Sequence, residues 1–159
     1  MICIRKGKRA FANEYGSKVN LAIDKNLFVV SHETYHSNSH DSTLLKPALE
    51  NWVEVTGTVP REVHTDRGYA QTEENREELE LLVEWVGIET LGSAPHPCKE
   101  KAWFKRGRTL RATTEAVIGH LKQDHLWDRC RYKGKRGDQI NACLGATAWN
   151  LNNLARRIS

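Results

Sequence analysis

Two segments in the first third of the chain are rich in apolar and β-branched residues. They are KVNLAID (residues 18–24) and LFVVSHETYH (residues 27–36), and typical turn residues, Asp, Lys and Asn, lie at their junction (residues 24–26). Strand-forming segments separated by a short polar turn predict an antiparallel hairpin.

Helical and strand-like patterns alternate along the rest of the chain. After the polar loop SNSHD, apolar residues at helical spacing predict a helix over about residues 43–55, capped by Asp41 or Ser42. The remaining elements follow in this order: a short strand REVHTD that ends on Asp66, an amphipathic helix over 71–86, a strand IETL over 88–91, a loop over 92–101, a basic segment over 103–107, a helix over 110–122, a loop KGKRG and a mostly apolar helix over 138–158. This order indicates an α/β fold with a mixed sheet flanked by helices.

Length and composition favour one globular domain over residues 1–159. Apolar residues make up 39% of the chain and there are five tryptophans, which argues against disorder. The four cysteines are far apart and never form a CxxC pair, so we expect a reducing compartment. No apolar run approaches the roughly 20 residues of a membrane span, and the N-terminus lacks the apolar core of a signal peptide. We therefore expect a soluble, cytoplasmic protein.

The net charge of +4 is unevenly distributed. Residues 71–89 hold seven glutamates and one arginine, whereas residues 99–136 hold twelve lysines or arginines and four acids. The C-terminal helical part, about 103–159, is therefore expected to face a polyanion. The densest cluster is RCRYKGKR, whose cations Arg131, Lys133, Lys135 and Arg136 are candidate DNA contacts, although basic loops are often merely solvated.

Asp66 follows a predicted strand, where functional groups of α/β sheets collect. The glycine at position 68 is expected to let the chain turn sharply. An aspartate at this place can equally well satisfy the turn itself, and the local pattern does not decide between the two roles.

Glu115 lies on one stripe of the predicted helix with Arg111 and Lys122, at the border of the apolar face. A surface ion pair with Arg111 would contribute only about 0.2–0.5 kcal/mol, and by itself it is the simpler interpretation. Together with Asp66, however, Glu115 could hold a divalent metal, Mg²⁺ or Mn²⁺, because such ions prefer oxygen ligands. The cations on the stripe would then bind phosphate.

Other candidate sites have weaker patterns. His32, His36 and His40 recur every four residues, but in predicted strand and loop this spacing makes no common face and no zinc site. Trp103 and Phe104 could stack on a base, and core packing is expected for at least one of them.

Five segments taken together resemble the C-terminal part of a bacterial insertion-sequence transposase of the DDE type, with a ribonuclease-H-like catalytic core. They are KGKRAFANEYGSKVNLAI, SNSHDSTLL, VHTDRGY, RATTEAVIGHLK and RCRYKGKRGDQINACLGATAWNL. Their order and spacing extend the resemblance from about residue 6 to residue 156. It implies a bacterial protein that binds transposon-end and target DNA and catalyses Mg²⁺-dependent strand cleavage and transfer. A homodimer is left open.

The resemblance also implies roles for individual residues. Asp66 matches the second catalytic aspartate, and Glu115 matches the third acidic residue in the Tyr-x2-Arg-x3-Glu-x6-Lys helix of the family. Arg111 and Lys122 match its two cations, while Arg108 stands where the family has tyrosine. Asp41 matches a structural or site-adjacent aspartate in a segment where Ser39 replaces the family's proline.

The first catalytic aspartate of the family belongs to a strand upstream of the KGKR segment. We therefore expect a fragment that lacks the first strand of the ribonuclease-H-like sheet and has little or no strand-transfer activity alone. Asp24 is the nearest substitute by position, but it falls in the predicted hairpin turn. Two alternatives remain, a non-catalytic DNA-binding remnant and a metal-dependent nuclease in which Asp24 or Asp41 supplies the third ligand.

Overall fold

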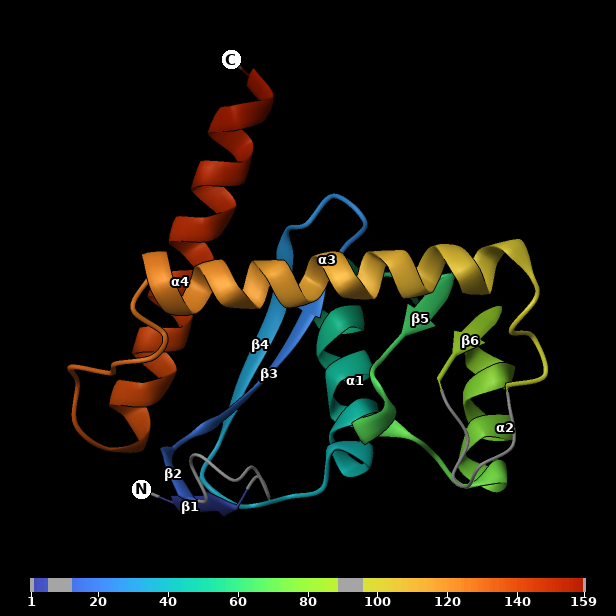
Figure 1. Ribbon diagram of the computed structural model, residues 1–159, viewed down its shortest axis with the longest axis horizontal. Coiled ribbons are helices and arrows are strands. Elements are labelled where there is room, and N and C mark those ends of the chain that lie inside the picture. Colours follow the sequence, from blue (N-terminus) through green and yellow to red (C-terminus); the bar gives the residue numbers. More distant parts are fainter. Residues whose placement is uncertain (1, 6–12, 89–95, 159) are drawn as a thin grey trace. The chain divides into compact units, whose positions relative to one another are not determined.

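The computed structural model describes residues 2–5, 13–88 and 96–158 (Figure 1). It confirms an α/β composition, with the elements β1 (Ile2–Arg5), β2 (Asn13–Gly16), β3 (Lys18–Ile23), β4 (Val29–Tyr35), the 3₁₀ turn η1 (Asp41–Leu44), α1 (Leu45–Thr56), β5 (Glu62–His64), the 3₁₀ turn η2 (Arg67–Tyr69), α2 (Glu73–Leu82), β6 (Trp85–Gly87), α3 (Ala102–Asp124) and α4 (Gly134–Ile158). The chain divides into two compact units, and α3 contributes residues to both. The first unit comprises residues 1–39 and 118–159, and the second comprises residues 40–117.

In the first unit, β3 and β4 form the predicted antiparallel hairpin. The turn is held by Asp24, whose Oδ1 accepts hydrogen bonds from the backbone N–H groups of Asn26 (2.9 Å) and Phe28 (2.8 Å). Asp24 therefore has the local turn role that the sequence pattern predicts.

Helix α4 packs on β4 through two side chains of its inner face. The indole N–H of Trp149 donates to the carbonyl of Leu27 at 2.7 Å. The carboxamide of Asn150 accepts from the N–H of Val29 (2.8 Å) and donates to its carbonyl (2.9 Å). Gly145 of the same helix makes room for Trp127, since a Cβ at position 145 would lie 2.1 Å from Nε1 of that indole.

The second unit is built around a parallel pair, β5 and β6, in which Val63 lies opposite Val86. Its core consists of apolar side chains from α1, the α2 region and β6, and the buried members are Leu45, Leu79, Val83, Val86 and Ile88. Parallel strands require a crossover connection, and α2 belongs to it. This arrangement leaves the segment after β5, which carries Asp66, at the end of a short, half-buried strand.

The single mixed sheet that we expected is not formed by the described residues. Their strands make three two-stranded sheets, β1–β2, β3–β4 and β5–β6. Antiparallel and parallel pairing both occur, as predicted, but in different sheets. The pairing of β1 with β2 had no counterpart among the predicted elements.

Several element boundaries differ from the predicted ones. Helix α2 ends at Leu82 and the next strand occupies 85–87, whereas the predicted strand at 88–91 falls largely outside the described residues. Helix α3 already begins at Ala102 and α4 at Gly134, so the predicted basic segment and loop are partly helical. The side chain that caps is His40 and not Asp41 or Ser42: it accepts from the N–H of Ser42 at the start of η1, and α1 itself has no side-chain cap.

Among the described helices, none combines the length and the apolar character needed to cross a membrane.

Candidate functional site

Asp66 lies just beyond β5 and caps the 3₁₀ turn η2. Its Oδ1 accepts a hydrogen bond from the backbone N–H of Gly68 at 2.9 Å, and the side chain is exposed. Asp66 therefore does cap the turn, which is one of the two roles that the sequence pattern left open. This role engages one of the two carboxylate oxygens, so it is compatible with a second role.

A second carboxylate, that of Asp41, is close to Asp66. A Cβ added to Gly68 would lie 2.6 Å from Oδ2 of Asp41 and 3.1 Å from Oδ1 of Asp66. Gly68 does not have a positive φ, so our expectation that its backbone freedom makes the turn is wrong. The residue must be small because two carboxylates approach it.

The environment of Tyr69 reflects the same pair of carboxylates. Burial, followed by the negative charges of Asp41 and Asp66, raises the pKa of the Tyr69 hydroxyl well above its ordinary value. The hydroxyl therefore stays protonated, next to a negatively charged corner of the second unit.

The N-terminal half of α3 approaches β5 closely because two glycines make room for His64. A Cβ at Gly107 would lie 1.9 Å from Nδ1 of His64, and a Cβ at Gly87 would lie 2.2 Å from the same atom. Nε2 of His64 is 3.2 Å from a carboxylate oxygen of Glu62. The imidazole thus fills the space between β6 and α3.

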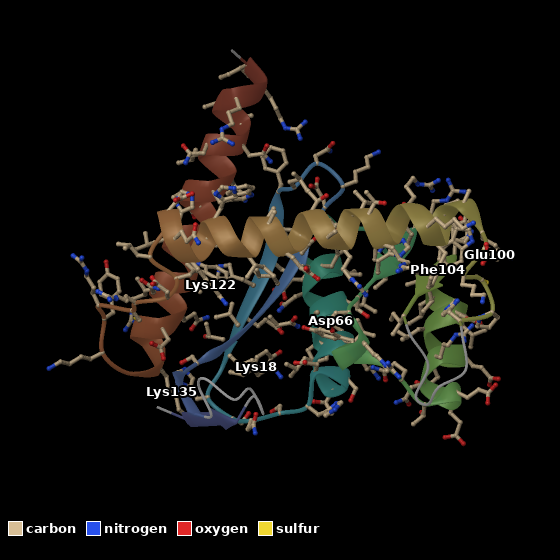
Figure 2. All side chains as sticks on the ribbon, viewed as in Figure 1. Lys18, Asp66, Glu100, Phe104, Lys122 and Lys135 are labelled. Atoms are coloured by element: carbon tan, nitrogen blue, oxygen red, sulfur yellow. The ribbon has the colours of Figure 1, made fainter. Side chains whose placement is uncertain are left out.

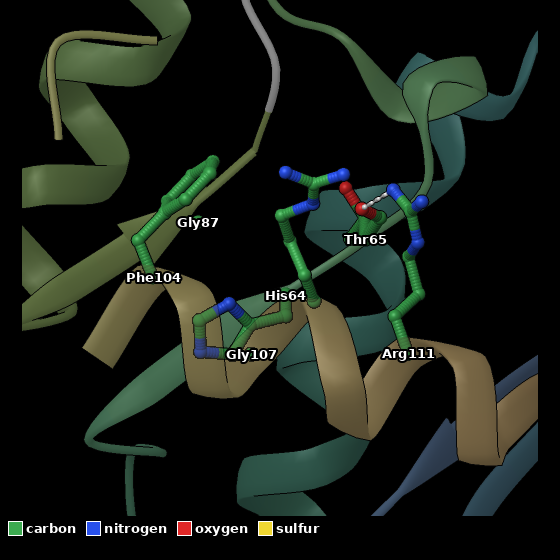
Figure 3. Close-up of a pocket in the computed structure, with 7 residues that line it drawn as sticks. His64, Thr65, Gly87, Phe104, Gly107 and Arg111 are labelled. Carbon is green, nitrogen blue, oxygen red and sulfur yellow. Dashed lines mark hydrogen bonds between the residues drawn. The ribbon is translucent and has the colours of Figure 1, made fainter. Parts of the chain in front are cut away.

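This packing brings the side chain of Arg111 to the end of β5. Nη1 of Arg111 donates to the carbonyl of Thr65, the residue before Asp66, at 3.4 Å (Figure 3). Nε of Arg111 is buried and has no hydrogen-bond partner among the described residues. A shallow pocket surrounds this contact, lined by His64, Thr65, Gly87, Phe104, Gly107, Arg108 and Arg111.

The sequence patterns did not single out Arg108 as a site residue. It lines the pocket together with Arg111, one helical turn before it. Its position three residues before Arg111, where the family has tyrosine, is the signal that could have identified it. The pocket is therefore bordered by two guanidinium groups.

Glu115 lies one turn after Arg111 on α3 and is exposed. The i,i+4 ion pairs among the described residues are Arg76–Glu80 and His120–Asp124, and none joins Arg111 to Glu115. The described residues therefore show an exposed Glu115 without the Arg111 ion pair of the simpler interpretation. Within the ranges that the structure describes, no three His, Cys, Asp or Glu side chains gather closely enough to hold a metal ion.

The remaining predicted DNA contacts belong to the first unit, and all are exposed. Lys122 lies near the C-terminal end of α3 and Lys135 in the first turn of α4 (Figure 2). Arg131 and Lys133 precede α4, and Arg136 also lies in its first turn. The exposed ring of Tyr132 lies within this group, and we call the four cations at positions 131, 133, 135 and 136 the α4 basic cluster.

Phe104 is buried, with 4% of its surface exposed, which confirms core packing for one of the two predicted aromatic residues. Its neighbour Trp103 stacks on Trp85, with ring centroids 5.9 Å apart. The aromatic rings at the start of α3 thus attach the helix to β6.

A family model described as the transposase DDE domain matches residues 4–151 of the chain. The match includes both candidate carboxylates, the pocket and the α4 basic cluster. The comparison with curated proteins gave no match, and neither did the comparison with solved structures.

Proposed function

Because the chain belongs to the transposase DDE domain family, we propose that it acts in DNA transposition, with Asp66 and Glu115 as carboxylates of a strand-cleaving and strand-joining site. The observation that carries this assignment is the bond from Arg111 to the carbonyl of Thr65. It ties the turn of α3 before Glu115 to the residue before Asp66. Both carboxylates therefore belong to the same compact unit, on segments that this hydrogen bond connects.

The donors present fit a divalent metal ion of the kind that the family generally uses. Asp66 and Glu115 are exposed and offer carboxylate oxygens, the ligands that Mg²⁺ and Mn²⁺ prefer. These two side chains would hold the ion. When bound, such an ion neutralises charge on the attacking and leaving oxygens of a phosphodiester.

The guanidinium groups of the pocket would bind the DNA backbone beside the carboxylates. Arg111 is anchored on the Thr65 carbonyl through Nη1 and keeps a buried, unpartnered Nε. Buried donors of this kind are normally satisfied, and a phosphate oxygen would satisfy this one. Arg108 adds a second positive charge at the same place.

The α4 basic cluster would bind a further stretch of backbone. Lys135 and Arg136 lie in the first turn of a helix, where the unpaired N–H groups and the helix dipole attract anions. Tyr132 is exposed between the cations and could pack on a sugar or a base. The partners we propose are therefore transposon-end and target DNA, in the bacterial cytoplasm.

The metal assignment can be tested without relying on activity. We expect Fe²⁺ with peroxide and ascorbate to cut the chain near residues 66 and 115, because radicals form at the bound metal. Mg²⁺ should compete with this cutting, and Asp66→Asn or Glu115→Gln should abolish it. The assignment fails if the cuts persist in both variants or fall elsewhere.

Strand transfer itself is tested with duplexes carrying the terminal repeat of the element. We expect the chain alone to join few or no 3′ ends to a target plasmid in Mg²⁺. Efficient joining by the chain alone would contradict this expectation, which rests on the finding that no three His, Cys, Asp or Glu side chains gather closely among the described residues.

A metal-dependent nuclease is the second candidate, because Asp41 lies beside Asp66 at Gly68. Asp24 is a poorer candidate, since it holds the β3–β4 turn. The nuclease predicts nicking of plasmid DNA that Asp41→Asn and Asp66→Asn both abolish. A non-catalytic DNA-binding protein instead predicts salt-sensitive binding that survives Glu115→Ala, without nicking.

A further inference from the structure

The chain leaves α3 through a residue with an unusual backbone conformation. Leu126 has a φ of 59°, in the left-handed region where helix ends usually have glycine, because a Cβ crowds the backbone there. Its side chain is 46% exposed. In the part of the chain that the structure describes, the other non-glycine residue with a positive φ is Leu27, whose side chain is half-buried. Leu126 thus combines a strained backbone with an apolar side chain in solvent.

Hydrogen bonds of the neighbouring residues, and not the leucine side chain, hold this turn. The N–H of Trp127 donates to the carbonyl of Leu121 at 3.1 Å, and the carbonyl of Leu126 accepts from the N–H of Arg129 at 3.2 Å. The side chain of Asn141, on α4, donates to the same carbonyl at 3.2 Å. A strained conformation persists only where its surroundings determine it, and such residues cluster at functional sites. A glycine could make the same three hydrogen bonds, so the turn does not explain the leucine.

Positive charge surrounds Leu126. From residue 126 to residue 136 the chain has five lysines or arginines and one acid, Asp128. These cations are Arg129 and the α4 basic cluster, and all of them are exposed. The bond from Asn141 fixes Leu126 near the start of α4, which carries two members of the cluster. An apolar side chain among cations fits a partner that is anionic outside and apolar inside.

Duplex DNA is such a partner, because its phosphates lie outside and its stacked bases lie inside. Proteins that bend DNA frequently insert an apolar side chain, leucine among them, into a base step from the minor groove, and they kink the duplex by about 20–90°. An anionic membrane also offers charge outside and apolar groups inside. The family to which the chain belongs favours DNA.

We propose that Leu126 inserts into a base step of bound duplex DNA and kinks it, while the α4 basic cluster binds phosphates beside the kink. This inference rests on the DNA binding proposed above. Asn141 is five residues after Arg136, about 7.5 Å along the helix, which corresponds to roughly two nucleotides of duplex rise. A turn fixed by three hydrogen bonds leaves the leucine little backbone freedom to lose on binding, which favours insertion.

Energy transfer between fluorophores at the two ends of a duplex of about 24 base pairs measures the kink. The duplex should contain several TA steps, because these steps kink easily. At protein concentrations that saturate the duplex, the wild type should raise the transfer efficiency, and Leu126→Ala should lose most of this increase. Leu126→Met retains a long apolar side chain and should bend the DNA like the wild type. So should the matched control, Leu81→Ala on α2, which changes a leucine that is 86% exposed.

Thermal unfolding separates this role of Leu126 from a structural one. Leu126→Gly relieves the left-handed conformation and should raise the melting temperature by about 2–4 °C, while it loses the bend. A leucine with only a structural role predicts the opposite, which is a lower melting temperature and unchanged bending.

Three results would overturn the inference. A wild type that saturates the duplex without raising the energy transfer disproves the kink and leaves the proposed DNA binding intact. A Leu126→Ala variant that bends DNA like the wild type removes the role of the leucine, again without touching DNA binding. Binding to vesicles of phosphatidylglycerol and phosphatidylcholine, with no binding to DNA at the same salt concentration, would assign the loop to a membrane surface and contradict the proposed function as well.

Discussion

At the residue scale, the position of Arg111 depends on a glycine one turn earlier in α3. His64 occupies the space in which a side chain at Gly107 would lie, so any larger residue there must displace the imidazole or the helix. Since α3 reaches Thr65 through Arg111, the displacement would also move the turn that leads to Glu115. Gly107 thus connects the packing of the second unit to the geometry of the site.

We expect Gly107→Ala to lower the free energy of unfolding by about 1–3 kcal/mol, the usual cost of overpacking. Gly119→Ala in the same helix is the control, because nothing lies within 4 Å of its added Cβ. It should stabilise by roughly 0.5–1 kcal/mol through helix propensity. Urea unfolding measures both changes, and equal effects of the two substitutions would contradict the role of the His64 contact.

His32 on β4 predicts a pH dependence of stability. Burial lowers the pKa of its imidazole, and the charge of Glu33 opposes this in part. Below the ordinary value of 6.5 the unfolded chain therefore binds a proton that the folded chain resists, and the folded state loses stability as the pH falls. Urea unfolding at pH 7.5 and 5.5 should show this loss in the wild type and a smaller loss in His32→Leu. An identical loss in both would show that other groups cause it.

The sequence predicted the local structure around a candidate residue where neighbouring residues determine it. Asp66 was predicted at a strand end because the strand and the turn after it are coded by neighbouring residues. The role of Gly68 was not predicted, because it depends on Asp41, which approaches from another part of the chain. Helical spacing also could not predict that Arg111 and Glu115 form no ion pair. The guanidinium of Arg111 donates instead to the carbonyl of Thr65, which comes from another part of the chain.

At the element scale, the largest difference between the predicted and the observed elements concerns the end of α2. The apolar residues Val83 and Val86 continue the helical period, yet the helix stops at Leu82 and β6 follows. Val86 lies opposite Val63, and the N–H of Trp85 donates to the carbonyl of Arg61 at 3.1 Å. Pairing with β5 thus overrides a pattern that is compatible with both structures.

Asn150 should contribute strongly to the attachment of α4 to the hairpin. Its carboxamide satisfies both backbone groups of Val29, which is buried. Asn150→Ala leaves a buried donor and a buried acceptor without that partner, and we expect it to cost about 1–3 kcal/mol of unfolding free energy. The control is Asn152→Ala, an exposed asparagine of the same helix, which should change stability by no more than about 0.5 kcal/mol. Similar costs for both would mean that helix propensity alone is measured.

At the scale of the whole molecule, the predicted α/β composition is confirmed. Which strands share a sheet was not predictable from pattern, because pairing depends on contacts between distant residues. The basic third of the chain could be located from composition alone, since charged side chains remain exposed whatever the fold. Our DNA-binding assignment is therefore independent of the exact element boundaries.

Salt dependence tests that assignment. Affinity for duplex DNA falls as salt rises, and each phosphate contact makes the slope of log affinity against log salt concentration steeper by roughly 0.9. Replacing the four cations of the α4 basic cluster by glutamine should therefore reduce the slope by up to about 4, as measured by fluorescence anisotropy. Lys25→Gln/Lys46→Gln, outside the cluster, serves as control and should leave the slope unchanged. An unaltered slope in the quadruple variant would place the DNA elsewhere.

The bond between Asn150 and Val29 also bears on the behaviour of the protein in concentrated solution. A strand at the edge of a small sheet is a template to which strands of other molecules can add, which leads to aggregation. Asn150 occupies both backbone groups of Val29, so a foreign strand would have to displace a side chain of α4 before it could pair there. The Asn150 carboxamide thus protects the edge of β4 from pairing with another molecule. Its loss would make the protein aggregate faster in concentrated solution even where the fold survives.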